Sequence, residues 1–338
     1  MKMTKDRTAT MLAIVQDGYG APERVLRSDH IDRPQAGTGE VLVRLRATSV
    51  NTPDWGTVAG VPYVLRLGTG LRRPARPIRG SDLAGVVEAV GPDVNDLRPG
   101  DEVLGSLWGS GSRAGTFAEY TVAPERQLVT KPTGLSFEEA AASVMTGLTA
   151  LTAMREVGGA GPGKRVLVNG ASGGVGTMAV QIAKTLGAEV TGVCGTGNVE
   201  LVRSLGADHV IDHTKQDFTQ IQRRYDIILD NVLNRPPSAT ARLLAPHGVF
   251  IPNSIGNTGG LLAGLPRTLR ATLMRKGTTK VKLVKFAVNR ENLDALVHLL
   301  ESGQVRVVID TTYPLDQAAS AVAHMLGHHA RGKVAISV

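Results

Sequence analysis

The middle of the chain alternates short apolar runs with segments of helical period. Residues 165–168, 189–194 and 209–212 are short segments of strand length, and each contains two or three apolar side chains. Between the first two runs, apolar side chains recur at three- to four-residue spacing, at Val175, Met178, Ile182 and Leu186. That spacing is one face of an amphipathic helix. A second helix is predicted over residues 199–205. Strands that alternate with helices predict a parallel α/β sheet.

This α/β pattern begins near Ser136, where Ser-Phe-Glu-Glu has the form of a helix capping box. It continues through further apolar runs at 225–230 and 249–252. Residues 11–130 lack the alternation and show short strand patterns between turn residues, at 41–47, 83–90, 102–104 and 116–123. The sequence therefore predicts a compact β-rich unit followed by an α/β unit.

The tail from Arg290 mixes both patterns. It predicts a helix that contains Leu293, Leu296, Val297 and Leu300, and a second helix over 316–326. Valine-rich residues 305–309 and the final residues 333–338 are predicted strands. The sequence of the tail alone does not reveal where it packs.

A glycine-rich turn over residues 170–176 follows the run at 165–168 and precedes the first helix. Its fingerprint is Ala171-x-Gly173-x-x-Gly176. Glycines let the backbone approach a phosphate closely, and the helix N-terminus offers unpaired N–H groups with partial positive charge. With a strand before it and a helix and strand after it, the turn predicts a dinucleotide pyrophosphate site.

The end of the second strand bears on the choice of cofactor. An NAD site usually has an acidic residue about 20 residues beyond the glycines, bonded to the ribose 2′-hydroxyl. Gly195-Thr196-Gly197-Asn198 stands there, with no carboxylate to repel a 2′-phosphate and with side chains that can donate. We expect NADP(H). An NAD site that uses Glu200 is the alternative.

Composition narrows the class of protein. No uninterrupted apolar run approaches the ~20 residues needed to cross a bilayer. The N-terminal residues do not resemble a secretory signal, and the single cysteine, Cys194, fits a reducing cytoplasm. The net charge of +8 is concentrated in two basic stretches, 66–79 and 267–285. Neither is interleaved with aromatic residues, so we expect solvated faces or attraction of an anionic cofactor rather than nucleic-acid binding.

Several ordered motifs resemble the medium-chain dehydrogenase/reductase superfamily, in its zinc-independent quinone oxidoreductase-like branch. They are Ser49-Val-Asn-Thr-Pro-Asp-Trp55, Gly80-Ser-Asp-Leu-Ala-Gly85, Val90-Gly91, Arg98-Pro-Gly-Asp-Glu-Val103, Gly115-Thr-Phe-Ala-Glu-Tyr120, Thr146-Gly-Leu-Thr149, the turn at 171–176, Leu205 to Asp212, and Ala330-Arg-Gly-Lys333. The resemblance implies a GroES-like β-rich domain, residues 1–133 with 288–338, and a Rossmann domain with a doubly wound parallel sheet, residues 134–287. It also implies an active cleft between them and commonly a dimer.

The zinc ligands of related alcohol dehydrogenases are replaced in this sequence. Asn51 stands at the thiolate position, and Gly80-Ser81-Asp82 stands where those enzymes have Gly-His-Glu. The chain has one cysteine, so a four-cysteine zinc lobe is absent as well. Zinc needs several nitrogen or sulfur ligands. Without a Lewis acid, reducing an activated acceptor is easier than oxidising an alcohol at neutral pH. We therefore expect hydride transfer to a quinone or an α,β-unsaturated carbonyl compound.

The resemblance also implies cofactor contacts. Ser172, Gly173, Gly174, Val175 and Gly176 would hold the pyrophosphate, and Gly195, Thr196 and Asn198 the 2′-phosphate, with His213 near the adenosine. Thr146 would lie near the nicotinamide. Asn231 and Ser254-Ile255-Gly256 follow buried strands, and cofactors bind at the carboxyl ends of such strands. His329, Ala330 and Arg331 would close over the cofactor from the C-terminal segment.

No general acid stands out in the sequence. Asn51, Asp54 and Tyr63 are the candidates for lining the substrate pocket, and Tyr63 could donate a proton to an enolate. Simple packing of Tyr63 and proton supply by water remain open. Three other functions also remain open: an NADPH-binding regulatory or RNA-binding protein with little catalysis, an alcohol or aldehyde dehydrogenase, and a reductase of acyl-thioester enones.

Overall fold

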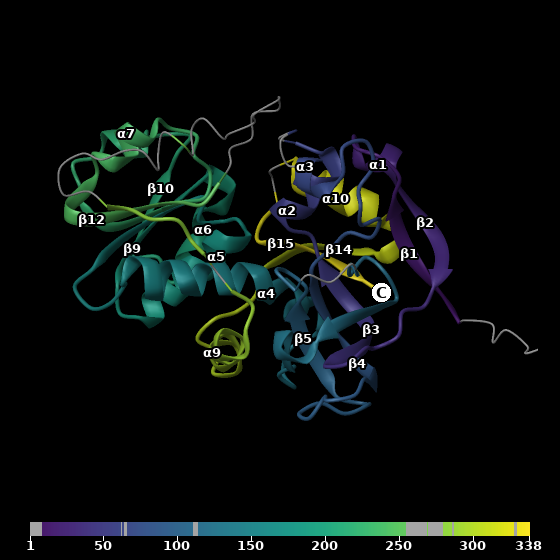
Figure 1. The fold of residues 1–338 in the computed structure, drawn as a ribbon. Coiled ribbons are helices and arrows are strands. Elements are labelled where there is room, and N and C mark those ends of the chain that lie inside the picture. The colour runs from purple at the N-terminus through teal and green to yellow at the C-terminus, as the bar shows by residue number, and fades with distance from the viewer. Residues whose placement is uncertain are drawn as a thin grey trace, which may run out of the picture.

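The computed structural model describes residues 9–61, 63, 66–110, 114–254, 269, 280–285, 287–327 and 330–338. The chain forms two lobes, each built on its own large sheet (Figure 1). The helix α4 (Phe137–Leu151) lies where the lobes meet.

One lobe contains a six-stranded sheet in which every pair of neighbouring strands is parallel. The strand order is β10-β9-β8-β11-β12-β13. The strands are β8 (Arg165–Asn169), β9 (Glu189–Cys194), β10 (His209–Asp212), β11 (Tyr225–Asp230), β12 (Leu244–Pro252) and β13 (Lys280–Val281). The chain proceeds outward from β8 to one edge and then returns to β11 on the other side. This is a Rossmann sheet, and it confirms the predicted doubly wound α/β class.

Helices connect these strands. They are α5 (Gly174–Thr185), α6 (Val199–Ser204) and the short α7 (Pro237–Ala241). The apolar stripe predicted for the first helix is buried at Met178 and Ile182 of α5. Its burial attaches α5 to the large apolar cluster that also includes α4 and the faces of β8, β9 and β11.

The other lobe contains a seven-stranded sheet with GroES-like character. Its order is β14-β15-β3-β4-β5-β7, with β6 paired to β3. These strands are β3 (Glu40–Ser49), β4 (Asp82–Val90), β5 (Glu102–Ser106), β6 (Tyr120–Pro124), β7 (Leu128–Thr130), β14 (Ile309–Pro314) and β15 (Lys333–Ser337). The C-terminal strand β15 runs antiparallel to β3, with Ala335 opposite Ser49. The two ends of the sequence therefore build one sheet.

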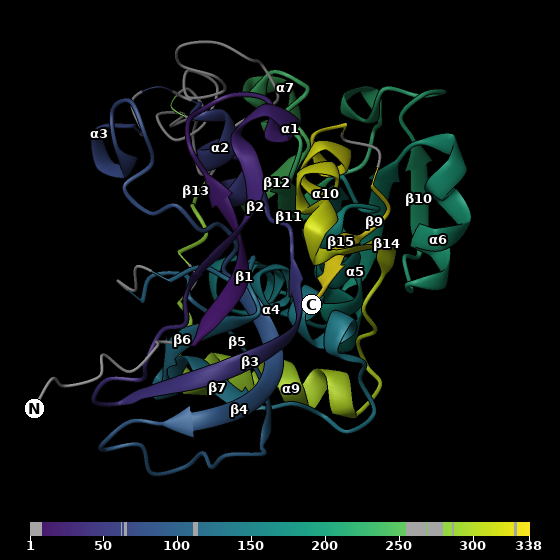
Figure 2. The ribbon, with the colours of Figure 1, turned by 90° about the vertical axis from the view of Figure 1, so that its right-hand side faces the viewer.

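Smaller elements cover this second sheet. The strands β1 (Thr10–Gln16) and β2 (Leu26–Asp32) form an antiparallel pair, joined through the short α1 (Pro22–Val25). Helices α2 (Thr52–Ala59), α3 (Arg66–Thr69) and α10 (Ala318–Leu326) lie on the same side of the molecule as α1 (Figure 2).

Helix α4 packs against both lobes. It contacts β3, β4, β5 and β15 as well as α5 and α9 (Arg290–Glu301). Its predicted capping box is present: Glu139 N donates to Ser136 Oγ at 3.1 Å, and Ser136 N donates to Glu139 Oε2 at 3.0 Å. A Cβ at Gly147 would lie 2.5 Å from Leu296 Cδ1, so glycine lets α9 pack closely on α4. The exact domain boundaries at 133/134 and 287/288 stay predictions.

Two predicted strands differ from the structure. Residues 305–308 lie outside the strands, and β14 begins only at Ile309. Val305 and Val307 are nevertheless buried in the apolar cluster around α4, so their hydrophobicity reports burial rather than sheet pairing. The strand predicted over 116–123 begins at Tyr120, because the backbone over 116–119 bends and makes a single bridge, from Ala118 to Ala13.

Candidate active site

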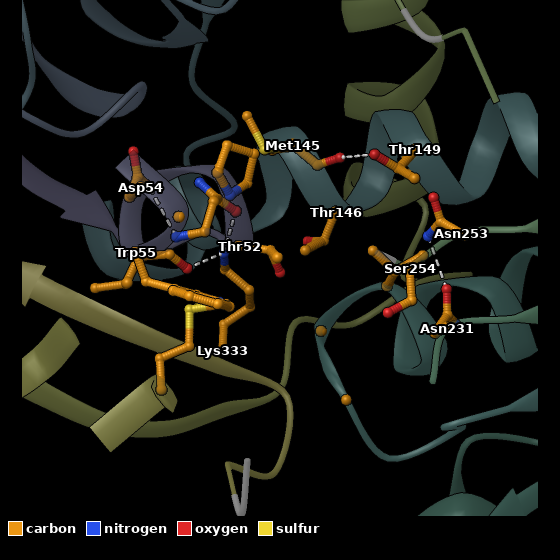
Figure 3. A pocket seen from close by; sticks show the side chains of 18 of the residues that line it. Thr52, Asp54, Trp55, Met145, Thr146, Thr149, Asn231, Asn253, Ser254 and Lys333 are labelled. Atoms are coloured by element: carbon orange, nitrogen blue, oxygen red, sulfur yellow. Dashed lines mark hydrogen bonds between the residues drawn. The ribbon is translucent and has the colours of Figure 1, made fainter. Parts of the chain in front are cut away.

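A cavity of about 1410 Å³ lies between the two lobes. One wall comes from α2 and the start of β15, and the other from the glycine turn and the ends of the Rossmann strands. Figure 3 shows both walls, with Thr146 of α4 between them. The cavity is larger than the ~300–1,000 Å³ typical of a site for one small molecule, so it has room for a cofactor and an acceptor together.

The glycine turn has the geometry that the fingerprint predicts. Gly170 has φ +78°, which favours glycine, and α5 begins at Gly174. A Cβ at Gly176 would lie 2.0 Å from the carbonyl oxygen of Gly170, so only glycine fits there. A Cβ at Gly173 would have no atom nearer than 3.6 Å. Gly173 lines the cavity, and its lack of a side chain leaves room for a phosphate.

The C-terminal segment crosses this turn. Gly332 N donates to Ser172 O at 2.8 Å, and Gly332 forms a parallel bridge with Gly173. Ala330 lines the cavity, and a guanidinium nitrogen of Arg331 lies 3.4 Å from the point where Gly197 would carry a Cβ. His329 lies outside the described residues. The structure therefore brings Ala330 and Arg331 to the turn and to the loop after β9.

The loop after β9 contains part of the predicted 2′-phosphate site. Gly195 and Asn198 line the cavity, as do Ser172, Gly174, Val175 and His213. Asn198 Nδ2 donates to Ser172 Oγ at 3.2 Å, while its Oδ1 is buried without a hydrogen bond. Thr196 is not among the lining residues, and its hydroxyl donates to Asp212 Oδ2 at 2.7 Å.

The carboxylate of Asp212 corrects the expectation that no negative charge lies near the predicted 2′-phosphate site. No carboxylate lies within residues 195–198, but that of Asp212 lies directly beside Thr196. Hydrogen bonds, first from the Thr196 hydroxyl and then from Thr214, lower the pKa of Asp212 to about 2. The loop therefore has a neighbouring negative charge, which the sequence argument missed. Glu200, the alternative NAD contact, is paired with Arg203 on α6.

The Rossmann strand ends supply amides and hydroxyls. Asn231 follows β11, and Asn253 and Ser254 follow β12. Asn253 Nδ2 donates to Asn231 Oδ1 at 2.8 Å, whereas Asn231 Nδ2 is buried without a partner (Figure 3). Ile255 and Gly256 lie outside the described residues. The unpartnered amide atoms of Asn198 and Asn231 and the open side of Gly173 fit a bound dinucleotide.

On the opposite wall, Asn51 belongs to a buried polar cluster, which we call the Asn51 cluster: Asn51, Asp54, Asp82 and Lys333. Asn51 Nδ2 donates to Asp82 Oδ2 at 2.8 Å, and Asn51 N donates to Asp54 Oδ2 at 2.8 Å. Lys333 Nζ donates to Asn51 Oδ1 at 2.6 Å and to Val50 O at 2.7 Å. Elements from both ends of the sequence thus meet at one amide.

Burial dominates the electrostatics of the Asn51 cluster. It raises the pKa of Asp54 to about 7, against the hydrogen bond from Asn51 N. It also raises the pKa of Asp82, opposed first by the Lys333 ammonium. Burial lowers the pKa of Lys333, opposed by Asp82 and Asp54. A protonated Asp54 is therefore accessible near neutral pH.

The structure does not bring Tyr63 into the cavity. Its side chain is 46% exposed and lies outside the lining residues. Its ring centroid is 4.4 Å from the Arg66 guanidinium carbon, and a phenol stacked in this way is explained by surface packing. Thr146 does line the cavity, but its hydroxyl donates to Ala142 O at 3.0 Å, so it can only accept a further hydrogen bond.

Several polar lining or supporting residues were not predicted from the sequence, among them Asp82, Asn253 and Lys333. Asp82 and Lys333 lie inside recognised motifs, Gly80 to Gly85 and Ala330 to Lys333, but neither was predicted as a site residue. The one sequence signal for Lys333 is its position: it is a charged residue at the start of a short apolar strand.

The described part of the chain has no cluster of metal-binding side chains. There, no three His, Cys, Asp or Glu side chains come close enough together to hold a metal ion. Ser81 is buried, and its hydroxyl has no hydrogen-bond partner among those residues. Among the same residues, no helix is long and apolar enough to cross a membrane.

Comparison with known proteins agrees with this architecture. Residues 37–133 match the family model described as "Alcohol dehydrogenase GroES-like domain", and residues 205–336 match "Zinc-binding dehydrogenase". The chain is 35% identical to "Quinone-oxidoreductase QR1, chloroplastic" of Triphysaria versicolor, over 96% of this chain and 98% of that protein. It is 32% identical to the human "NAD(P)H oxidoreductase RTN4IP1, mitochondrial", over 99% of this chain and 91% of that protein.

Among solved structures, the quinone oxidoreductase from Coxiella burnetii superposes with a TM-score of 0.84 at 26% identity, covering 98% of this chain and 100% of that one. The fold and site define a two-domain oxidoreductase of the kind that uses a nicotinamide cofactor. The chain belongs to the medium-chain dehydrogenase/reductase superfamily, and its relatives include quinone oxidoreductases.

Proposed function

We propose that this oxidoreductase is an NADPH-dependent, zinc-independent reductase of quinones or α,β-unsaturated carbonyl compounds. The observation that carries the proposal is the single cavity that joins the glycine turn to the Asn51 cluster. One wall is suited to a dinucleotide, and the other offers an amide and a protonatable carboxyl group to a carbonyl compound. The similarity to a quinone oxidoreductase and to "Trans-enoyl reductase pgmF" of Aspergillus terreus supports this acceptor class.

The proposal of zinc independence rests on Asn51 and Ser81, which stand where related alcohol dehydrogenases have zinc ligands. The Asn51 amide oxygen already accepts from Lys333, and a lysine ammonium so close to the site repels a divalent cation. Ser81 offers a neutral hydroxyl, which is a poor zinc ligand. An alcohol or aldehyde dehydrogenase without zinc remains the alternative within the same family.

Each part of the cavity would have its own role. When bound, NADPH supplies the hydride. Ser172 to Gly176 would hold its pyrophosphate with backbone N–H groups at the start of α5. Thr146, Asn231 and Ser254 would surround the nicotinamide, and Gly195, Asn198 and His213 the adenosine end. The residues of α2 would orient the acceptor, so that much of the rate enhancement comes from positioning.

NADPH over NADH is supported by Arg331. Its guanidinium lies beside Gly197, and no ion pair joins it to any residue in the described ranges. A 2′-phosphate there would meet a charge-assisted, planar donor. Thr196 and Asp212 would shape the loop rather than contact the phosphate.

Proton supply is proposed for Asp54 or water. A carboxyl group with a pKa of about 7 is half protonated at neutral pH, which suits it to proton delivery. The basic residues Arg76 and Arg79 line the cavity, so this part of the basic stretch 66–79 belongs to the site. Most of the stretch 267–285 lies outside the described residues. An RNA-binding or regulatory role remains the alternative outside catalysis.

The proposal is tested by a matched screen with NADPH and NADH against quinones, small enones and acyl-thioester enones, with and without a metal chelator. We expect turnover with NADPH that the chelator does not change. Absence of turnover with every acceptor, together with salt-dependent RNA binding, would replace the proposal with the regulatory function. Size-exclusion chromatography with light scattering tests the proposed dimer, and localisation in cells tests the proposed cytoplasmic placement.

A further inference from the structure

The side-chain amide of Asn51 is held in one orientation by two charged neighbours. Its oxygen accepts from Lys333 Nζ at 2.6 Å, and its nitrogen donates to Asp82 Oδ2 at 2.8 Å. Lys333 and Asp82 each favour the charged form of the other, and in that state the ammonium can only donate and the carboxylate can only accept. If the amide were rotated by half a turn, its NH₂ group would face the Lys333 ammonium and its oxygen would face the Asp82 carboxylate, and both hydrogen bonds would be lost. The orientation follows from the chemistry of the neighbours.

Asp82 is itself held in place. It lies at the start of β4, fully buried, and its Oδ2 accepts from Ser49 Oγ at 2.9 Å as well as from Asn51. Lys333 lies at the start of β15, 4% exposed, with a second bond to the carbonyl of Val50. The pairing of β15 and β4 with β3 fixes both charges relative to Asn51.

Lys333 also adjoins the cofactor side of the cavity. Its Cδ lies 2.9 Å from the point where Gly174 would carry a Cβ, and Thr146 Cγ2 lies 3.0 Å from the same point. The lysine stem therefore lies beside the glycine turn, while its Nζ reaches Asn51. This arrangement links the dinucleotide wall to the acceptor wall through one side chain.

One amide hydrogen of Asn51 is left over. Of the two Nδ2–H groups, one is used by Asp82, and Asn51 lines the cavity. Because the ammonium withdraws electron density through the amide oxygen, the remaining N–H becomes a stronger donor. A donor of this kind stabilises negative charge that develops on a substrate oxygen.

We propose that Lys333 is a positioning residue that orients and polarises Asn51, so that the free Asn51 N–H donates to the carbonyl oxygen of the acceptor. The inference rests on the proposed function. The hydride adds with its electron pair to the conjugated carbon of an enone or quinone, the π electrons move to the oxygen, and that oxygen accepts from Asn51. A proton from Asp54 or water then completes the reduction. Through Asn51, the lysine charge would help to stabilise the negative charge on the acceptor oxygen, as a metal ion does in zinc-dependent relatives.

The test compares acceptors that need this oxygen contact to different degrees. Lys333→Met removes the charge and keeps the stem, and Lys333→Arg keeps the charge. Lys131→Met is the matched control, since Lys131 is also buried but donates to Pro132 O and Leu135 O, away from the cavity. The measurements are kcat and KM for NADPH, with a weakly activated enone and with a strongly electron-poor quinone.

We expect Lys333→Met to lower kcat for the weakly activated enone by on the order of 10²-fold, and for the electron-poor quinone by much less. KM for NADPH should stay within about threefold, Lys333→Arg should regain part of kcat, and Lys131→Met should change stability but not kcat. A kcat loss equal for both acceptors, or no loss in the folded variant, would overturn the inference.

Two further variants keep the test decisive if Lys333→Met does not fold. Lys333→Met with Asp82→Asn removes both charges and leaves no unpaired carboxylate. Asn51→Ala leaves both charges in place and must show the same acceptor-dependent loss, and adding Lys333→Met to it must cause little further loss. Additive losses would mean that Lys333 does not act through Asn51. Failure of the wild-type protein to reduce any acceptor would instead refute the proposed function.

Discussion

The side-chain nitrogen of Lys333 lies 2.6 Å from the side-chain oxygen of Asn51, and 282 positions separate the two residues in the chain. The contact exists because β15 pairs with β3, directly before Asn51. It makes the last strand of the chain part of the acceptor wall. Substitutions in this strand are therefore expected to affect catalysis as well as folding.

Asp54 should make stability depend on pH. Its pKa in the folded protein, about 7, is above its ordinary value of 3.8, so between these values the folded state binds the proton more tightly. Stability therefore falls as pH rises from about 4 to 7 and levels off above 7, with a slope of up to about 1.4 kcal/mol per pH unit from this group. Asp54→Asn should remove that part of the slope in urea unfolding measured from pH 5 to 8. Parallel curves for the two proteins would contradict the raised pKa.

Two glycines of the turn should separate folding from binding. Gly176→Ala would place a Cβ 2.0 Å from Gly170 O and should cost about 3 kcal/mol of unfolding free energy. Gly173→Ala meets nothing nearer than 3.6 Å, so its stability should change by only about 0.5 kcal/mol. Its affinity for NADPH should fall on the order of tenfold, because the methyl group occupies the approach of the pyrophosphate. Urea unfolding and fluorescence titration measure the two effects. If Gly173→Ala leaves the affinity for NADPH unchanged, the pyrophosphate does not bind at this turn.

Arg331 should decide cofactor preference. Arg331→Ala is expected to raise KM for NADPH about tenfold while KM for NADH stays within about twofold, since only NADPH has the 2′-phosphate. Glu200→Gln is the matched control, because Glu200 is paired with Arg203 and faces solvent. If Glu200→Gln instead weakens NADH binding and Arg331→Ala changes neither cofactor, the NAD alternative is correct.

Tyr63 should be dispensable for turnover. Tyr63→Phe removes the hydroxyl group and keeps the ring that packs against Arg66. Because the ring is half exposed and outside the cavity lining, kcat should stay within about twofold of the wild-type value at each pH. A loss of kcat above about tenfold, greatest at high pH, would mean that Tyr63 donates the proton after all.

The relation between sequence and structure differs from element to element. The stripe at Met178 and Ile182 predicted α5, and Ser136 with Glu139 predicted the start of α4, because both signals are local. The run at 305–309 misled, since a buried extended loop and a buried strand have the same hydrophobicity. Thr196 was a reasonable phosphate contact by position, but its hydroxyl is bonded to Asp212 on the neighbouring strand.

By itself, the sequence determined the glycine turn, the alternation of strand and helix around it, and the replacement of zinc-ligand types by Asn51 and Ser81. These three features depend only on residue type and on spacing between residues that are close in the sequence. Tertiary structure alone decided that Lys333 and Asp82 hold the Asn51 amide from both sides, and that Arg331 reaches Gly197. Those relationships require β15 to cross the molecule and pair with β3, and the free energy of that pairing comes from burial over the whole sheet. No local pattern in the sequence records it.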